Sequence, residues 1–371
     1  MKKVPYGSVG SFDDLVSQGY FYIDRTNYLE KLEGMSEKHL FFLRPRRFGK
    51  SLFVSILQHY YGLEHADKFD RLFGDFYAGK HPTALKNSYL ILKFNFSGIN
   101  TTTNEISYRG FLNSVRYSVE DFLTTYKAFF NSEHLKTLIN IASPEDIMKQ
   151  LWNWVKSEGK GKKIYVLIDE YDQFTNELIA YRFEEFKKIV SINGWVRKFY
   201  ETLKIGADKG IIDRTFITGV TPITFDSLTS GFSNATDVST DLELSGMMGF
   251  TDEEVRGLLQ NLGLKEEKLE QAMQDLKQWY DGYVFSEDAK TAIYNSEMVL
   301  YFIKEFVKRN DYPQNLLAPS VATDYHKIQS MFRIAHKEKE NLVTLKKILT
   351  DDEVTSFLVQ KFNFADCNVL L

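Results

Sequence analysis

The chain has 371 residues, a formal net charge of −4 at pH 7 and a hydrophobic fraction of 43%, which is ample for two domains or for one domain with a substantial lid. The slight acidic excess gives no support to nucleic-acid binding through a general basic field, and the single cysteine excludes a disulfide framework and a cysteine-based zinc site. The N-terminus lacks the apolar core of a signal peptide and no stretch is as long and apolar as a membrane helix, so we expect a cytoplasmic protein without membrane contact.

Residues 1–37 precede the first strong strand pattern. A short helix is expected over 12–15, an extended run over 21–24 and a further helix over 26–32. Tyr22, in the extended run, is a candidate for stacking on a bound base, although a core position is the commoner role of such an aromatic.

The stretch 44–51 reads Arg-Pro-Arg-Arg-Phe-Gly-Lys-Ser and lies between a short apolar run, 39–43, and a helical pattern that begins at Leu52. A strand, a tight loop with Gly-Lys-Ser and a helix together form the arrangement that binds a nucleoside triphosphate, because loop and helix amides converge on the phosphates. Lys50 would contact the β- and γ-phosphates, and Ser51 would place its hydroxyl on Mg²⁺. The alternative is an ordinary helix N-terminus with Ser51 in its first turn.

The stretch departs from the usual G-x-x-x-x-G-K-[ST] pattern at Arg44, which stands where the first glycine belongs. Its arginines would contact phosphate through bidentate guanidinium groups, act on a neighbouring subunit, or pair with acidic residues such as Asp24 or Asp172 and shape the loop. The predicted nucleotide-binding set comprises Arg46, Arg47, Phe48, Gly49, Lys50, Ser51 and Leu52.

Between this loop and the next motif the sequence predicts regular structure. Residues 89–96 are expected to form a strand, and 105–156 to form helices. An apolar stripe at helical spacing, which is most simply core, comprises Phe111, Val115, Val119 and Phe122.

A second motif follows the run 164–168, which reads Ile-Tyr-Val-Leu-Ile and predicts a strand buried on both faces of a parallel sheet. The run ends in Asp169 and Glu170, in the Walker B pattern, and carboxylates at such a strand end lie where α/β sheets bind ligands. Asp169 would hold Mg²⁺, and Glu170 would polarise the attacking water as general base. The alternative is an acidic turn that caps the next helix. It is disfavoured because the same chain also has a Gly-Lys-Ser loop after a strand of its own.

A helical pattern over 181–207 leads to a further strand over 214–220. In P-loop ATPases with an additional strand between the loop strand and the Asp-Glu strand, that strand often ends in a polar residue that senses the γ-phosphate. Thr218 is the candidate for this catalytic role, and the alternative is a hydroxyl that is satisfied locally. The polar run 224–241 is expected to be a loop that responds to the nucleotide.

The remainder of the chain has helical patterns. A capping box over 251–254 begins one helix, and a second covers 266–280; together they predict a lid over the nucleotide. Further helices are expected over 297–310 and 342–361. The sequence therefore predicts an ATPase domain over 1–245 and a helical lid and C-terminal region over 246–371.

These motifs together resemble the AAA-ATPase-like family of bacterial and archaeal P-loop proteins, which is related to the AAA+ and STAND ATPases. In that family the arginine-rich loop lacks its first glycine, as it does here. The matching stretches follow the family's order and lie at 19–26, 43–52, 167–172, 218–223, 249–255 and 279–283.

The resemblance also implies a C-terminal PD-(D/E)xK-type nuclease in many relatives, with an Asp and a Glu-x-Lys triplet on adjacent strands that bind Mg²⁺. Glu-x-Lys triplets occur at 158–160, 185–187 and 266–268, in a turn or in helical patterns rather than in strands. We therefore expect this chain to lack the nuclease, as a short member of the family, a truncated form or a chain that has lost it.

The fold class we predict is α/β: a three-layer αβα P-loop NTPase with a parallel sheet, followed by a mostly helical lid. We expect it to bind ATP and Mg²⁺ and to hydrolyse ATP in order to switch a protein partner or an effector domain. A scaffold that binds nucleotide without hydrolysis is the first alternative, and a regulatory part of a DNA-processing nuclease system is the second. ATP is favoured over GTP because the chain has no Asn-Lys-x-Asp guanine signature.

Overall fold

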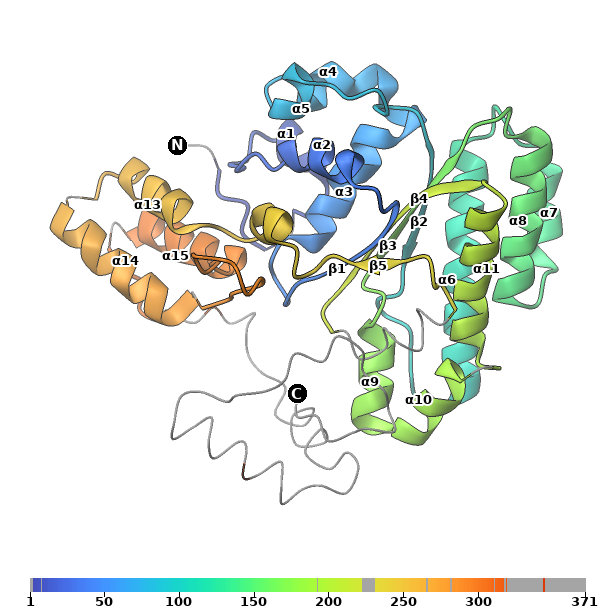
Figure 1. Cartoon of the computed structure of the whole chain (residues 1–371). Coiled ribbons are helices and arrows are strands. Elements are labelled where there is room, and N and C mark those ends of the chain that lie inside the picture. Colours follow the sequence, from blue (N-terminus) through green and yellow to red (C-terminus); the bar gives the residue numbers. More distant parts are fainter. Residues whose placement is uncertain are drawn as a thin grey trace.

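The sheet at the centre of the chain has five parallel strands in the order β2-β3-β4-β1-β5, as the computed structural model shows (Figure 1). The strands are β1 (His39–Leu43), β2 (Leu90–Asn95), β3 (Ile164–Asp169), β4 (Ile212–Gly219) and β5 (Thr236–Asp237). β4 pairs with both β1 and β3, so the predicted additional strand between the loop strand and the Asp-Glu strand is confirmed. All pairings are parallel, so the strand ends that carry the two motifs meet at one edge of the sheet.

Helices cover both faces of this sheet (Figure 1). Among the described residues, the α-helices are α1 (Phe12–Ser17), α2 (Asn27–Gly34), α3 (Lys50–Tyr61), α4 (Phe69–Phe73), α5 (Tyr77–Lys80), α6 (Asn104–Thr125), α7 (Glu133–Ile139), α8 (Pro144–Glu158), α9 (Gln173–Tyr181), α10 (Phe183–Val190), α11 (Trp195–Asp208), α13 (Asp252–Asn261), α14 (Glu266–Tyr280) and α15 (Ser296–Arg309), and the 3₁₀ helices are η1 (Leu63–Lys68) and η2 (Leu242–Met247). The structure describes residues 3–7, 9–191, 193–221, 231–264, 266–280, 282–309, 311–316, 318 and 343.

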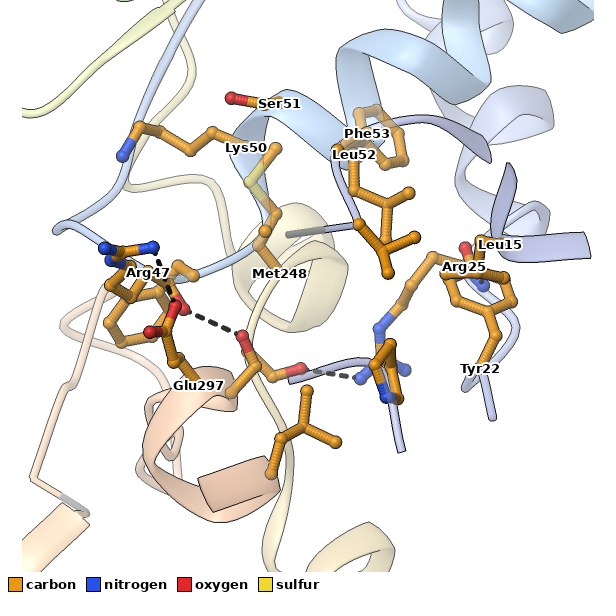
Figure 2. A pocket seen from close by; sticks show the side chains of 18 of the residues that line it. Leu15, Tyr22, Arg25, Arg47, Lys50, Ser51, Leu52, Phe53, Met248 and Glu297 are labelled. Atoms are coloured by element: carbon orange, nitrogen blue, oxygen red, sulfur yellow. Dashed lines mark hydrogen bonds and ion pairs between the residues drawn. The ribbon is translucent and has the colours of Figure 1, made fainter. Parts of the chain in front are cut away.

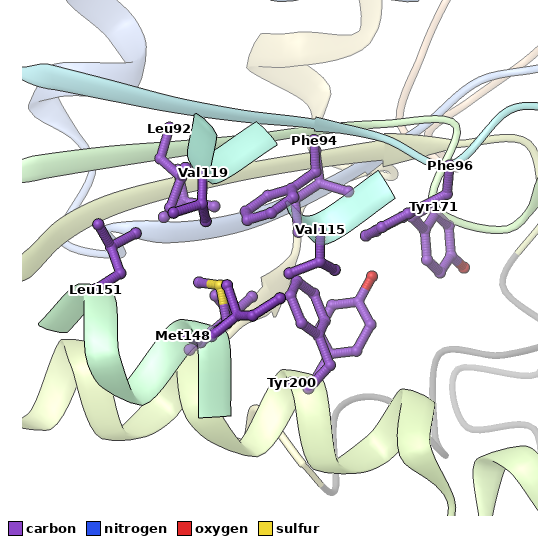
Figure 3. Close-up of a cluster of buried hydrophobic side chains, with 14 of the residues drawn as sticks. Leu92, Phe94, Phe96, Val115, Val119, Met148, Leu151, Tyr171 and Tyr200 are labelled. Atoms are coloured by element: carbon purple, nitrogen blue, oxygen red, sulfur yellow. The ribbon is translucent and has the colours of Figure 1, made fainter. Parts of the chain in front are cut away.

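Two apolar clusters, one on each face of the sheet, form the core of the sheet region. Because side chains alternate along a strand, β3 contributes Tyr165 and Leu167 to the cluster around α3, and Val166 and Ile168 to the cluster around α6, α8 and α11. Figure 3 shows the second cluster, with strand residues such as Phe94 facing helix residues. The predicted apolar stripe of α6 lies in it, and the predicted three-layer αβα fold is confirmed.

A third apolar cluster is formed mainly by α13, α14 and α15, which belong to the region predicted to form a lid, residues 246–371. The capping box before α13 is present as predicted, since the Thr251 hydroxyl accepts from the Glu254 N–H and the Glu254 carboxylate accepts from the Thr251 N–H. Phe21 and Ile23 of the N-terminal segment pack against this cluster. The segment before β1 therefore contacts the lid as well as the sheet.

Some details differ from the sequence-based expectation. The run 224–241 was expected to be a loop, but its described part contains β5, which extends the sheet beside β1. The helical pattern over 181–207 is broken before Gly194, where a side chain would collide with the Ile189 carbonyl oxygen at 2.0 Å. The helix expected over 342–361 lies outside the described residues apart from residue 343. In the described part of the chain, no helix has both the length and the apolar character needed to cross a membrane.

Candidate nucleotide site

The loop between β1 and α3 is tightly curved and leads directly into the N-terminus of α3. Gly49 is the N-cap residue of α3 and has a φ of 94°, in the left-handed region where glycine alone is unstrained. Arg47, two residues earlier, also has a left-handed backbone, with a φ of 72°. Because this conformation costs an arginine about 1 kcal/mol or more, the loop keeps its shape against local preference. Such a loop before a helix N-terminus is a site for anions.

The Lys50 side chain folds back onto its own loop. It is 4% exposed, and its ammonium group donates hydrogen bonds of 3.0 Å to the carbonyl oxygens of Arg44 and Pro45. Burial lowers the pKa of Lys50, while the nearby carboxylates of Glu170, Asp172 and Asp169 act in the opposite direction. The ammonium group therefore has main-chain partners that a phosphate oxygen can replace.

A cavity of about 670 Å³ opens beside this loop, within the range of about 300–1,000 Å³ that is usual for small-molecule sites. All seven residues of the predicted nucleotide-binding set line it, together with Glu170. Figure 2 shows Lys50 and Arg47 on one side of the cavity and Tyr22 and Leu15 on the other. The cavity thus has a cationic part near the loop and, near the N-terminal segment, an aromatic and aliphatic lining that also includes Arg25.

Two acidic residues at the end of β3 lie near the loop. Asp169 is 3% exposed, and among the described residues no hydrogen-bond donor reaches its Oδ1 atom. Glu170 lines the cavity with a left-handed φ of 53°. Burial raises the pKa of Glu170; the neighbouring carboxylates of Asp169 and Asp172 add to this effect, and Lys50 opposes it.

The oxygen atoms at this edge suit Mg²⁺. The Oδ1 atom of Asp169 is buried without a hydrogen-bond partner among the described residues, and the exposed Ser51 lies in the first turn of α3. The described residues contain no group of three or more His, Cys, Asp or Glu side chains that could hold a metal ion. Mg²⁺ commonly takes only one or two protein oxygens and completes its shell with phosphate and water, so the donor set fits such a site.

Asp172 has a role that the sequence analysis did not identify. It is fully buried, and its carboxylate accepts hydrogen bonds from the N–H groups of Val220 and Thr221, the Thr221 hydroxyl and the Asn176 amide. These bonds join the loop after β3 to the chain just after β4. Gly219 is required between them, because a side chain there would lie 2.3 Å from the Asp172 carboxylate.

Arg44 anchors the loop and does not line the cavity. The guanidinium group is sandwiched between the rings of Phe42 and Phe285, at 4.0 and 3.9 Å, and donates to the carbonyl oxygens of Leu43, Ser239 and Leu244. Burial lowers its pKa to about 9.

The loop-shaping interpretation therefore describes Arg44. The two acidic residues named as examples of partners, Asp24 and Asp172, bind other groups. Arg44 binds carbonyl oxygens, and Arg47 pairs with Glu297. Asp24 instead accepts from the N–H groups of Thr26 and Tyr77.

Thr218 is completely buried near the end of β4 and is not among the residues that line the cavity. Its hydroxyl donates a 2.7 Å hydrogen bond to the carbonyl oxygen of Phe42 on the neighbouring strand β1. This bond matches the alternative of a locally satisfied hydroxyl. Contact between Thr218 and a γ-phosphate stays a prediction.

Comparison with known proteins agrees with this geometry. The model of a family described as predicted AAA-ATPase matches residues 5–229, which is more than half of the chain. The chain belongs to this family. Its membership supports an ATP-binding NTPase, and the resemblance inferred from the motifs is confirmed.

Two further similarities were found for this predicted AAA-ATPase. It is 24% identical over 314 residues to the "Uncharacterized protein in vnfD 5'region" of Azotobacter chroococcum mcd 1; the match covers 82% of the chain and 52% of the relative. The chain thus spans about half the length of that curated relative. A Walker-type ATPase of Pyrococcus abyssi has a TM-score of 0.41 and 12% identity, over 88% of this chain and 75% of that one.

In this AAA-ATPase family member, residues of the predicted lid bind main-chain carbonyl oxygens of the P-loop. Asn295, just before α15, donates from its side-chain amide to the Arg46 carbonyl oxygen at 3.1 Å. The Ser296 hydroxyl donates to the Arg47 carbonyl oxygen at 2.9 Å. The N–H of Gly249 donates to the Phe48 carbonyl oxygen at 3.3 Å. Three successive loop residues therefore bind the lid region. No motif in the sequence indicated these contacts.

Side chains reinforce the same junction. Phe48, 1% exposed, makes edge-on ring contacts with Tyr283 at 4.9 Å and Phe285 at 5.5 Å. Arg47 forms a 3.1 Å ion pair with Glu297 in the first turn of α15. Farther along the cavity, Arg25 forms an ion pair with Glu254 and donates to the Gly249 carbonyl oxygen at 2.8 Å. The cavity is therefore bounded by the loop, the N-terminal segment and the lid together.

Proposed function

We propose that this chain binds ATP with Mg²⁺ in the cavity beside the loop and hydrolyses it. The observation that carries the proposal is the Lys50 ammonium group. It is held on two loop carbonyl oxygens at the N-terminus of α3, in a cavity that the Glu170 carboxylate also lines. A cation, oriented amides and a carboxylate base are parts that assist phosphoanhydride hydrolysis.

Binding would begin with an exchange of partners at Lys50. Phosphate oxygens would take the place of the Arg44 and Pro45 carbonyl oxygens, and the amides at the start of α3 would meet the remaining charge. Ser51 and Asp169 would hold Mg²⁺, which supplies further neutralisation of phosphate charge when bound. The Asp169 Oδ1 atom, buried without a donor, supports this assignment.

Glu170 would then act as the general base. It would orient a water molecule and accept its proton as the water attacks the terminal phosphorus, with ADP as the leaving group. Its raised pKa, caused mainly by burial, brings its basicity closer to neutral pH, which favours proton transfer.

The base of the nucleotide would lie in the part of the cavity near the N-terminal segment. Tyr22, Leu15 and Phe21 line that part, and they offer aromatic and aliphatic surface to a flat ring. We propose adenine as the base, since the chain has no Asn-Lys-x-Asp guanine signature.

Turnover measurements on purified protein test the proposal. We expect Mg²⁺-dependent release of phosphate from ATP, reduced turnover of GTP, and loss of activity with EDTA. Tight binding of ATP without phosphate release would favour the nucleotide-dependent scaffold. Absence of binding to either nucleotide would overturn the proposal.

We further propose that nucleotide state is transmitted to a protein partner or effector domain through the lid. The support is the direct attachment of the lid to Arg46, Arg47 and Phe48, which would move with bound phosphate. Amide hydrogen exchange with no nucleotide, with ADP and with a non-hydrolysable ATP analogue tests this idea. Protection of 231–262 and of α15 should differ between the diphosphate and triphosphate states. Protection confined to the loop around Gly49 would mean that binding switches nothing.

A further inference from the structure

The cationic part of the cavity contains an acidic side chain that the proposed chemistry does not use. The Glu297 carboxylate lies 3.1 Å from a guanidinium nitrogen of Arg47, and Figure 2 shows the pair beside the cavity that Lys50 also lines. A carboxylate in a phosphate-binding region opposes a phosphate that enters it, since like charges repel at short distance. Its presence there requires an explanation.

Glu297 is held in position by its surroundings. The Asn295 side chain accepts from the N–H groups of Glu297 and Met298 and so caps α15, while its amide donates to the Arg46 carbonyl oxygen. The Glu297 side chain is 12% exposed. The first turn of α15 is therefore fixed to the loop, and the carboxylate is directed at Arg47 by rigid elements.

Arg47, in contrast, has freedom to change partner. Its side chain is 45% exposed, and an ion pair with this exposure is weak. A guanidinium group binds a phosphate in the same forked geometry as a carboxylate, and the terminal phosphate of a nucleotide carries more charge than a carboxylate. A phosphate that reaches Arg47 would therefore displace Glu297 from it.

We propose that Glu297 is a selectivity residue that occupies the anion position on Arg47 until a triphosphate replaces it. The inference rests on the proposed function and assigns a regulation to the same site. The terminal phosphate of ATP exchanges with the carboxylate, whereas ADP, which lacks that group, leaves the pair of Arg47 and Glu297 intact. The exchange breaks the ion pair between Arg47 and Glu297, which is one of the contacts between α15 and the loop. The attachment of α15 to the loop therefore depends on whether the third phosphate is present.

The test compares nucleotide affinities of wild-type protein and Glu297→Gln by calorimetric titration of ATP and ADP with Mg²⁺. The variant should bind ATP about two- to fivefold more tightly and ADP with less than about a twofold change, since it removes a weak competing ion pair and a like charge. Glu305→Gln is the matched control, because it removes the same charge from the ion pair with Arg309 on the same helix. It should change neither affinity.

Two further variants separate the possible outcomes. In an Arg47→Ala background, Glu297→Gln should give a smaller gain in ATP affinity, because the competition for Arg47 is already gone. If Glu297→Gln does not fold, Glu297→Asp withdraws the carboxylate by one methylene and should give a gain of the same sign. Unchanged or weaker ATP binding, or an equal gain for ATP and ADP, would overturn the inference. Lys50→Ala tests the proposed function separately: loss of ATP binding there, with no effect of Glu297→Gln, would reject only the role of Glu297.

Discussion

The loops that follow β1 and β3 meet at the same edge of the sheet but satisfy their charged groups in different ways. After β1, the cations Arg44 and Lys50 bind carbonyl oxygens of the surrounding main chain. After β3, Asp172 accepts four hydrogen-bond donors, whereas the Oδ1 atom of Asp169 has none among the described residues. The charged groups of the two loops thus differ in their partners: main-chain carbonyl oxygens at Arg44 and Lys50, and no hydrogen-bond donor within the described residues at the Asp169 Oδ1 atom. Arg44 Nε is likewise buried without a partner among the described residues.

The difference predicts which polar groups hold the fold and which would contact the proposed ligand. Main-chain carbonyl oxygens are abundant around the P-loop and can stand in for phosphate oxygens at Lys50. A buried carboxylate oxygen without a donor is costly. Glu145 and Glu185 also have a buried oxygen without a hydrogen-bond partner among the described residues, and what distinguishes Asp169 is its place at the end of β3 beside the cavity-lining Glu170. Mutations in the two loops should therefore separate stability from binding.

Removal of the P-loop cation should have the largest effect. We expect Lys50→Ala to weaken ATP binding by about a hundredfold or more, because charge-assisted hydrogen bonds to phosphate are lost. Calorimetric or fluorescence titration measures the loss, and circular dichroism checks the fold. Lys38→Ala, at the opposite end of β1 and paired with Asp213, should leave ATP affinity unchanged. Wild-type affinity in a folded Lys50→Ala variant would reject the assignment of this loop.

Substitution of Glu170 should reduce ATP hydrolysis much more than ATP binding. Glu170→Gln should retain ATP binding and lose roughly 10²-fold or more in hydrolysis, since an amide cannot accept the proton of the attacking water. A phosphate-release assay beside an ATP titration distinguishes the two. Glu177→Gln, on α9 and bonded to Thr101, serves as the control. Hydrolysis by Glu170→Gln at the wild-type rate would require another base.

The contrast between Asp169 and Asp172 can be tested directly. Asp172→Asn should lower the free energy of unfolding by about 1–3 kcal/mol. The NH₂ group of the new amide cannot accept the hydrogen bonds that the carboxylate oxygen accepts, so buried N–H and O–H donors would lose their partner. Asp169→Asn should leave stability nearly unchanged and abolish the Mg²⁺ dependence of ATP binding. Urea unfolding and titration with and without Mg²⁺ measure both quantities. Equal losses of stability in the two variants would remove the distinction drawn here.

A smaller effect is expected in the pH profile of kcat/KM, which reports groups of the free protein. The base must be ionised, and burial raises the pKa of Glu170, so activity should fall on the acid side with a midpoint above 4.5. Lys50 must be protonated, and burial lowers its pKa, so activity should fall on the alkaline side below 10.5. An acid midpoint at or below 4.5 would show that Glu170 is not the group that titrates.

Local signals in the sequence predicted much of this arrangement. The apolar runs that end in Asp169 and in the Gly-Lys-Ser loop identified β3 and β1, because continuous apolar strands belong to buried parallel sheets. The rule that ligands lie beyond the carboxyl ends of such strands then brought Glu170 and Lys50 to one edge. Both line the same cavity in the structure.

The features that the sequence did not predict depend on contacts between distant parts of the chain. Asn295 and Arg46 are 249 positions apart, and no periodicity links them. From its chemistry alone, Arg44 could bind phosphate or shape the loop. In the structure its guanidinium group packs between the rings of Phe42 and Phe285, which come from distant parts of the sequence. The direction of the Thr218 hydroxyl likewise depends on the register of β4 beside β1.

The central position of β4 has a consequence for how the chain folds. Among the described residues β1 pairs only with β4 and β5, whereas β2 and β3 pair with each other. During synthesis the P-loop emerges early, but its strand gains no neighbour in the sheet until the ribosome has passed residue 219. Pairing over such a separation is intrinsically slow. The pocket can therefore be completed only late in synthesis, after the middle strand β4 and the lining residues up to Leu300 have been made.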